Sequence, residues 1–202
     1  MPTVDLIRHG EPVGGRRYRG TLDDPLSLEG WRQMEEALIS AGPWQRIYTS
    51  PLRRCREFAL DWGSRRGIPV TEDRRLQEMG FGLWEGKTPS ELRDSDPAIL
   101  RNFYRDPLRH WPRGAEDPGA FRERVIAVWQ ELADISGGAP VLVVTHAGVI
   151  RAVLGHILAV PAERMFSIQV ENAAVVRIAW DEERPPAVVL GTHVFRNETS
   201  SG

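Results

Sequence analysis

Two histidines stand directly after two apolar runs, and this placement could support chemistry. His9 follows residues 3–7 and Arg8 and precedes Gly10, and His146 follows residues 140–145. A neutral imidazole is a nucleophile near neutral pH, and a charged one binds anions. A lone histidine is more often structural, so the hypothesis of a catalytic site depends on the pair.

A metal site is the first alternative for this pair of histidines. It would need further ligands, and neither H-E-x-x-H nor C-x-x-C occurs. Cys55 is the only cysteine, which excludes an intrachain disulfide and a zinc cluster of thiolates. A nucleotide-binding protein of the Rossmann type lacks support, because no G-x-G-x-x-G follows the first apolar run. We therefore expect no metal and no other cofactor.

Strands and helices alternate along the chain around these residues. Residues 3–7, 46–49 and 140–145 are predicted strands, and the last is apolar almost throughout, which is typical of a strand buried on both faces. Residues 173–180 and 187–194 are predicted to form an edge hairpin. Helix-start signals stand at Ser27, Ser50-Pro51, Thr88-Pro89 and Asp117-Pro118, and a helix is also predicted over 149–158.

This alternation predicts an α/β protein with a mostly parallel sheet covered by helices. In such folds ligands bind outside the carboxyl ends of the strands, which puts Arg8, His9, Ser50 and His146 on one rim. A chain of 202 residues suits one domain, over 1–202. The helix-start signal at Thr88 and the longest irregular stretch, residues 105–116, predict a helical and loop insertion around 87–116 over the active-site end.

The composition of the chain argues against two kinds of binding partner, nucleic acids and membranes. A formal net charge of −2 favours neither nucleic acid nor an anionic membrane, and no apolar run approaches the roughly 20 residues of a membrane span. One cysteine and no secretory segment favour a cytoplasmic location. A homodimer through the last strands is left open.

Six sequence blocks stand in order along the chain, at residues 6–11, 25–30, 50–55, 76–86, 114–116 and 144–151. In these blocks and in their order, the chain resembles the histidine phosphatase superfamily, the phosphoglycerate mutase-like proteins. The resemblance implies a three-layer α/β/α sandwich with a mixed, mostly parallel central sheet.

Carried over position by position, the resemblance implies that His9 takes the phosphoryl group. Arg8, Arg54 and His146 would bind the phosphate oxygens, and Glu78 would act as general acid and then as base. Two guanidiniums and a second, protonated imidazole would supply the positive charge that phosphoryl transfer requires.

Each of these assignments has an alternative reading. Only the family register selects Arg54 over Arg53, which would otherwise both be solvated arginines on a helix. Glu85 is a second candidate for the acid, and Glu78 could instead pair with Arg74 or Arg75.

The sequence also departs from the family. Pro12 and Gly15 stand where many members have Thr or Gln and an Asn that contacts phosphate. One neutral phosphate contact is therefore missing, unless Arg16, Arg17 or Arg19 replaces it.

These observations predict a metal-independent phosphomonoesterase that acts through a phosphohistidine intermediate on a small phosphorylated metabolite. Residues 19–26 and the Arg-His-Gly-Glu-Pro start look most like the alpha-ribazole phosphatase branch, which makes alpha-ribazole 5′-phosphate a candidate substrate. The first alternative is a cofactor-dependent phosphoglycerate mutase, but mutases are generally longer, with segments that keep water out. A second alternative is a non-catalytic module that binds phosphorylated ligands, which loss of His9 or Glu78 would indicate; both are present.

Overall fold

A six-stranded mixed sheet forms the centre of the molecule, whose computed structural model describes residues 3–135, 139–181 and 184–189. The strand order is β3-β2-β4-β1-β5-β6. The first four of these pair in parallel, β5 runs antiparallel to β1, and β6 runs antiparallel to β5. The expected mixed sheet and edge hairpin are confirmed, although 190–194 of the predicted hairpin lie outside the described residues. The strands are β1 (Thr3–Arg8), β2 (Arg46–Thr49), β3 (Val70–Glu72), β4 (Val141–Thr145), β5 (Val175–Asp181) and β6 (Arg184–Val189).

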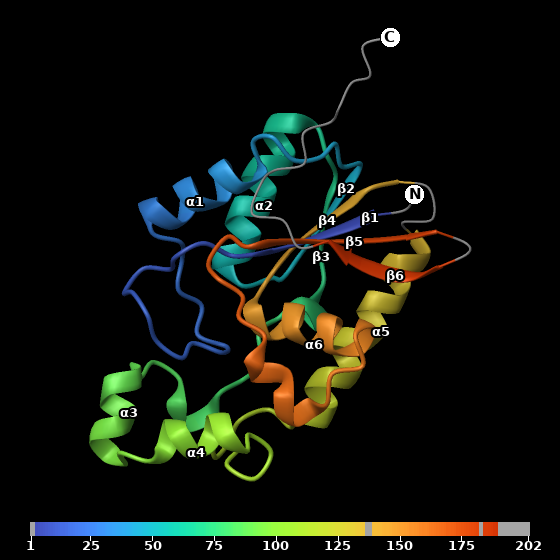
Figure 1. Ribbon diagram of the computed structural model, residues 1–202. Coiled ribbons are helices and arrows are strands. Elements are labelled where there is room, and N and C mark those ends of the chain that lie inside the picture. The colour runs from blue at the N-terminus through green and yellow to red at the C-terminus, as the bar shows by residue number, and fades with distance from the viewer. Residues whose placement is uncertain (1–2, 136–138, 182–183, 190–202) are drawn as a thin grey trace.

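Helices cover both faces of this sheet (Figure 1). On one face lie α1 (Leu28–Leu38) and α2 (Arg53–Arg66), and on the other lie α5 (Pro118–Ile135) and α6 (Ala147–Ile157). Strand β4 contributes alternate side chains to the two cores: Leu142 and Val144 to the first, Val141 and Val143 to the second. The α/β/α sandwich is therefore confirmed, and its central strand is buried on both faces as its sequence predicts.

Local capping chemistry begins two helices where expected. The side chain of Ser27 accepts the N–H of Gly30 at the start of α1. Thr88 and Glu91 form a capping box at the start of α3 (Pro89–Ser95). In α5 the predicted apolar face is the buried one: Phe121, Val125, Val128, Trp129 and Leu132.

The prediction that Ser50 caps α2 is wrong. The helix begins at Arg53, after Leu52, and its first backbone N–H is bound by the side chain of Asp23 at 2.6 Å. The N–H of Ser50 still belongs to the sheet, because it donates to the carbonyl of Val144 in β4. The Ser50 hydroxyl is thereby held at the rim of the sheet instead of at the helix.

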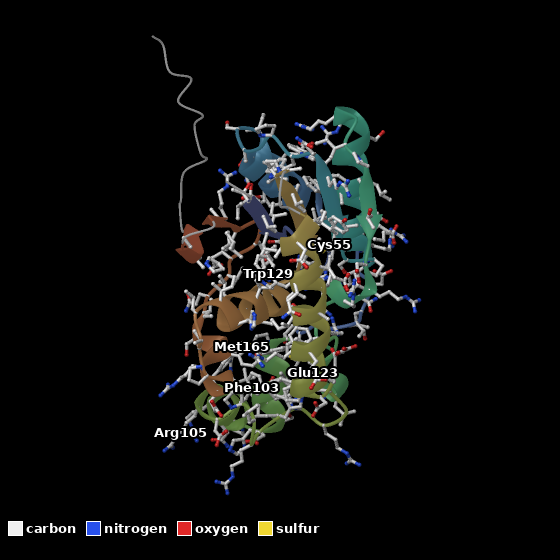
Figure 2. The ribbon with its side chains drawn as sticks, turned by 90° about the vertical axis from the view of Figure 1, so that its right-hand side faces the viewer. Cys55, Phe103, Arg105, Glu123, Trp129 and Met165 are labelled. Atoms are coloured by element: carbon white, nitrogen blue, oxygen red, sulfur yellow. The ribbon has the colours of Figure 1, made fainter. Side chains whose placement is uncertain are left out.

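The region around 87–116 packs on an apolar cluster of its own, formed by Trp84, Leu92, Leu100 and Phe103. It contains α3 and a short helix that the sequence did not predict, α4 (Ile99–Arg105), which begins without a capping side chain. Figure 2 shows Phe103 and Arg105 of α4 at the lower end of the molecule, away from Cys55. Short 3₁₀ turns complete the fold at η1 (Arg74–Leu76), η2 (Gly82–Trp84) and η3 (Ala162–Ser167).

Within the described ranges, no helix combines the length and the apolar character that spanning a bilayer requires.

Candidate active site

The pairing of β1 with β4 brings the two histidines together. Arg8 is the register partner of Thr145, and the N–H of His9 donates to the Thr145 carbonyl at 2.9 Å. Each histidine is the first residue after its strand, so the two rings lie edge to face with centroids 5.2 Å apart. Both side chains are buried.

His9 is held as a neutral imidazole with one nitrogen free. Its Nδ1 lies 2.7 Å from the carbonyl oxygen of Gly10, which can only accept, so Nδ1 carries the proton. Burial lowers the pKa of His9 well below 6.5, and the charges of Arg54 and Arg8 lower it further. Near neutral pH the Nε2 lone pair is therefore available for nucleophilic attack.

Arg54 lies in the first turn of α2 and is only 1% exposed. Its Nη1 donates to the Leu22 carbonyl at 2.6 Å and its Nη2 to the Gly20 carbonyl at 2.9 Å. Arg53, by contrast, is exposed and pairs with Glu57. The structure thus places Arg54 inside and Arg53 outside.

Arg8 is held in a similar way at the end of β1. Its Nη1 donates to the Val170 carbonyl at 2.6 Å. Burial lowers the pKa of Arg8 to about 10, so the guanidinium stays charged at neutral pH.

Both guanidiniums have a buried Nε–H group that makes no hydrogen bond within the described residues. In the described part of the chain, three buried side-chain nitrogens lack a hydrogen-bond partner, and two of them are Nε of Arg8 and Nε of Arg54. Leaving a buried donor unpaired is costly, so two beside the same imidazole indicate a site built for an anion.

His146 is fully buried between Ser50 and Cys55. Its Nε2 lies 2.7 Å from the Ser50 hydroxyl, and the Cys55 sulfur lies 3.6 Å from the same nitrogen. Burial lowers the pKa of His146 well below 6.5, and Arg54 adds to this. In the unliganded site His146 is therefore neutral, whereas the sequence-based prediction of a protonated imidazole concerns the site with phosphate bound. Burial also raises the pKa of the Cys55 thiol, which stays protonated.

Glu78 reaches the start of α6, next to His146. Its carboxylate accepts the N–H of Met79 at 3.0 Å and the N–H of Gly148 at 3.2 Å. The loop that carries it is held from α5 by Arg124, whose Nη1 donates to the Gln77 carbonyl and whose Nη2 donates to that of Glu78. The sequence did not single out Arg124.

The alternatives for Glu78 are occupied elsewhere. Glu85 joins two loops by accepting the N–H and hydroxyl of Thr21 and the N–H of Phe81. Arg75 pairs with Asp73 and Glu131 rather than with Glu78.

Of the three arginines near the missing phosphate contact, Arg19 is the buried one. It is held by Asp24 at 2.9 Å and by the Val13 carbonyl at 2.7 Å, and its charge helps to lower the pKa of His9. Arg17 donates to the Gly14 and Gly86 carbonyls, and Arg16 is exposed.

A surface cavity of about 610 Å³ adjoins this site only at Glu78. Neither histidine and neither of the two buried guanidiniums lines it, so it is not the phosphoryl site. Across residues 3–135, 139–181 and 184–189, no three His, Cys, Asp or Glu side chains gather as a metal site would require.

Comparison with known proteins agrees with this geometry. The sequence model of the Histidine phosphatase superfamily (branch 1) matches residues 4–192. The chain is 29% identical over 190 residues to phosphoserine phosphatase 1 of Hydrogenobacter thermophilus, covering 91% of this chain and 89% of the relative. It is also 29% identical over 199 residues to the adenosylcobalamin/alpha-ribazole phosphatase of Escherichia coli, covering 96% and 98%.

Among solved structures, Bacillus stearothermophilus YhfR superposes with a TM-score of 0.84 at 30% identity, covering 96% of this chain and 98% of the other. The resemblance noted from the sequence blocks, including the likeness to an alpha-ribazole phosphatase, is confirmed.

Proposed function

Because this chain belongs to the histidine phosphatase superfamily and is a phosphatase, we propose that it hydrolyses small phosphomonoesters through a phosphohistidine on His9. The observation that supports this most directly is the pair of buried, unpartnered Nε–H groups of Arg8 and Arg54 beside the free Nε2 of His9. A phosphoryl group carries three oxygens that accept such donors.

In the first half of the reaction, Nε2 of His9 attacks phosphorus. The P–N bond forms as the P–O bond to the alcohol breaks, and Glu78, as the general acid, gives a proton to the leaving oxygen. Arg8 and Arg54 bind the phosphoryl oxygens through their free N–H groups, and His146 adds a neutral donor. The guanidinium charges take the part that a metal ion plays in other phosphatases, so the reaction needs no metal.

In the second half, the carboxylate of Glu78 takes a proton from water. The water oxygen attacks phosphorus, the P–N bond breaks, and His9 returns to its neutral form with inorganic phosphate as the product. The hydrogen bond from Nδ1 to Gly10 keeps the same nitrogen free for the next turnover.

The substrate is proposed to be a small phosphorylated metabolite. Alpha-ribazole 5′-phosphate is one candidate, because the Escherichia coli relative with that name aligns with 96% of this chain. Phosphoserine is another, by the same reasoning from the Hydrogenobacter relative.

The test is hydrolysis of an aryl phosphate in the presence of a chelator, together with rapid-quench trapping of labelled phosphate on the protein. We expect turnover without metal and a label that survives alkali but not acid, as a phosphoramidate bond does. His9→Ala should abolish both, whereas His156→Ala, an exposed histidine on α6, should change neither. Turnover retained by His9→Ala would exclude the phosphohistidine route.

Two further outcomes identify the alternatives. Conversion of 3-phosphoglycerate to 2-phosphoglycerate faster than release of phosphate would identify a mutase. Binding of phosphorylated ligands with no turnover of any phosphomonoester would identify a binding module.

A further inference from the structure

We propose that Arg151 forms a second anion-binding site beside the phosphoryl site and binds a carboxylate carried by the alcohol part of the substrate. The proposal rests on the phosphatase function proposed above and names its substrate class. Arg151 lies three residues after Gly148 on α6, so the two residues share one helix face. Since the Gly148 N–H binds the Glu78 carboxylate, this face borders the group that would protonate the leaving alcohol.

One short segment holds Arg151 and Arg8 side by side. Nε of Arg151 donates to the Ile168 carbonyl at 2.8 Å, and Nη1 of Arg8 donates to the Val170 carbonyl at 2.6 Å. Two residues of chain span at most about 7 Å, so both guanidiniums are anchored within a few ångströms of each other. A small ester with its phosphate at Arg8 has its second functional group within reach of Arg151.

The guanidinium of Arg151 is available for a ligand. Within the described residues, neither of its terminal nitrogens makes a hydrogen bond or an ion pair. It is half-buried, with the Phe166 ring 5.7 Å from its Cζ. Burial lowers the pKa of Arg151, while Glu78 and Glu171 oppose this, yet neither carboxylate forms an ion pair with it. A partly desolvated guanidinium with free N–H groups gains from a bidentate anion.

The surrounding charges favour a carboxylate over a second phosphate. At the phosphoryl site two guanidiniums would face the dianion of a bound phosphate. Arg151 supplies a single positive charge with Glu78 and Glu171 nearby, which matches a monoanion and would repel a dianion.

Two tyrosines that contact each other lie near Arg151. The hydroxyls of Tyr18 and Tyr104 lie 2.9 Å apart, which links the loop before α1 to α4, and both residues act electrostatically on Arg151. The substrate class that fits is a short phosphorylated hydroxy acid. This ranks alpha-ribazole 5′-phosphate, which has no carboxylate, below such compounds.

The experiment compares 3-phosphoglycerate with glycerol 3-phosphate, which differ only in the carboxylate, and adds an aryl phosphate as a third substrate. For the unchanged protein we expect kcat/KM to favour 3-phosphoglycerate by roughly 10- to 100-fold, the range of a hydrogen-bonded charged group. Arg151→Met should remove this preference, mainly through KM, and leave aryl phosphate hydrolysis within about threefold of the unchanged protein. Arg151→Lys should restore part of the preference.

Arg164→Met is the matched control, because Arg164 is an exposed arginine on η3, and it should behave as the unchanged protein. If the unchanged protein hydrolyses the aryl phosphate but shows no preference for 3-phosphoglycerate over glycerol 3-phosphate, the carboxylate site is overturned and the phosphatase proposal stands. Equal losses on all three substrates in Arg151→Met would show a structural role and also overturn it. If the unchanged protein hydrolyses none of the three, the phosphatase proposal fails and this inference with it.

Discussion

The hydroxyl oxygen of Ser50 lies 2.7 Å from Nε2 of His146, and both side chains are fully buried at the ends of the adjacent strands β2 and β4. The same oxygen accepts the N–H of Leu52 at 3.3 Å, so its proton is free to be donated to Nε2. In neutral His146 the ring proton then sits on Nδ1. Ser50 therefore fixes both the orientation of the His146 ring and its tautomer.

Replacing Ser50 should weaken catalysis through His146. In Ser50→Ala the ring loses its partner, and kcat/KM for an aryl phosphate should fall by about tenfold or more. Nitrogen NMR of His146 should show a mixture of tautomers, whereas Ser50→Thr, which keeps the hydroxyl, should recover a single one. An unchanged tautomer in Ser50→Ala would contradict the assignment.

Arg54 and Arg53 provide a matched pair on one helix turn. Arg54→Lys cannot bind both loop carbonyls and also offer an N–H to phosphate, so kcat/KM should fall by roughly 100- to 1,000-fold. Arg53→Lys keeps an exposed charge and should change kcat/KM by less than about twofold. Similar losses in the two variants, measured with one aryl phosphate, would disprove the selection of Arg54.

Gly148 leaves the space that Glu78 occupies. A Cβ at this position would lie 2.2 Å from the Glu78 carboxylate, so Gly148→Ala must displace that flexible side chain. We expect a lower kcat, with the larger loss for an alkyl than for an aryl phosphate, because the poorer leaving group depends more on its proton. Gly155→Ala on the same helix meets only an ordinary contact at 3.9 Å and should retain full kcat.

The buried histidines predict how stability depends on pH. Burial lowers the pKa values of His9 and His146 in the folded protein. Below pH 6.5 both residues therefore bind protons in the unfolded chain but stay neutral in the folded protein. The free energy of unfolding should therefore be at its full value above pH 6.5. It should fall as the pH drops, by up to about 1.4 kcal/mol per unit for each histidine. Chemical denaturation at several pH values should show a shallower slope for His146→Gln, and parallel slopes would contradict the prediction.

Asp5 should be a stability determinant rather than a catalytic one. It is buried in β1, where it binds Arg177 of β5 through two contacts of 2.7 Å and the indole N–H of Trp44 at 2.8 Å. Asp5→Ala removes the buried carboxylate that Arg177 and the indole N–H of Trp44 both bind, and should cost about 3–5 kcal/mol of unfolding free energy by urea titration. Asp61→Ala, which breaks an exposed pair with Arg65, should cost less than about 1 kcal/mol.

Local chemistry explains what could be predicted of the fold. The caps at Ser27 and Thr88 involve residues three positions apart, and the buried face of α5 follows from its helical spacing. Such signals are complete within one element, so they can be recognised before any packing is known. Strand β3 is too short to carry one, and helix α4 begins without a capping side chain.

The sequence by itself determined that two histidines follow two buried strands, and its family register named Arg8, Arg54 and Glu78 beside them. Only the tertiary structure decided that Arg54 is buried and Arg53 exposed, and that His146 is neutral. It also showed that Ser50, 96 residues away, faces that ring, and that Arg151 shares its anchoring segment with Arg8. The reason is physical: a sequence pattern reports which side of its own element a residue faces. Partners, protonation and unpaired donors depend on groups brought together from distant parts of the chain.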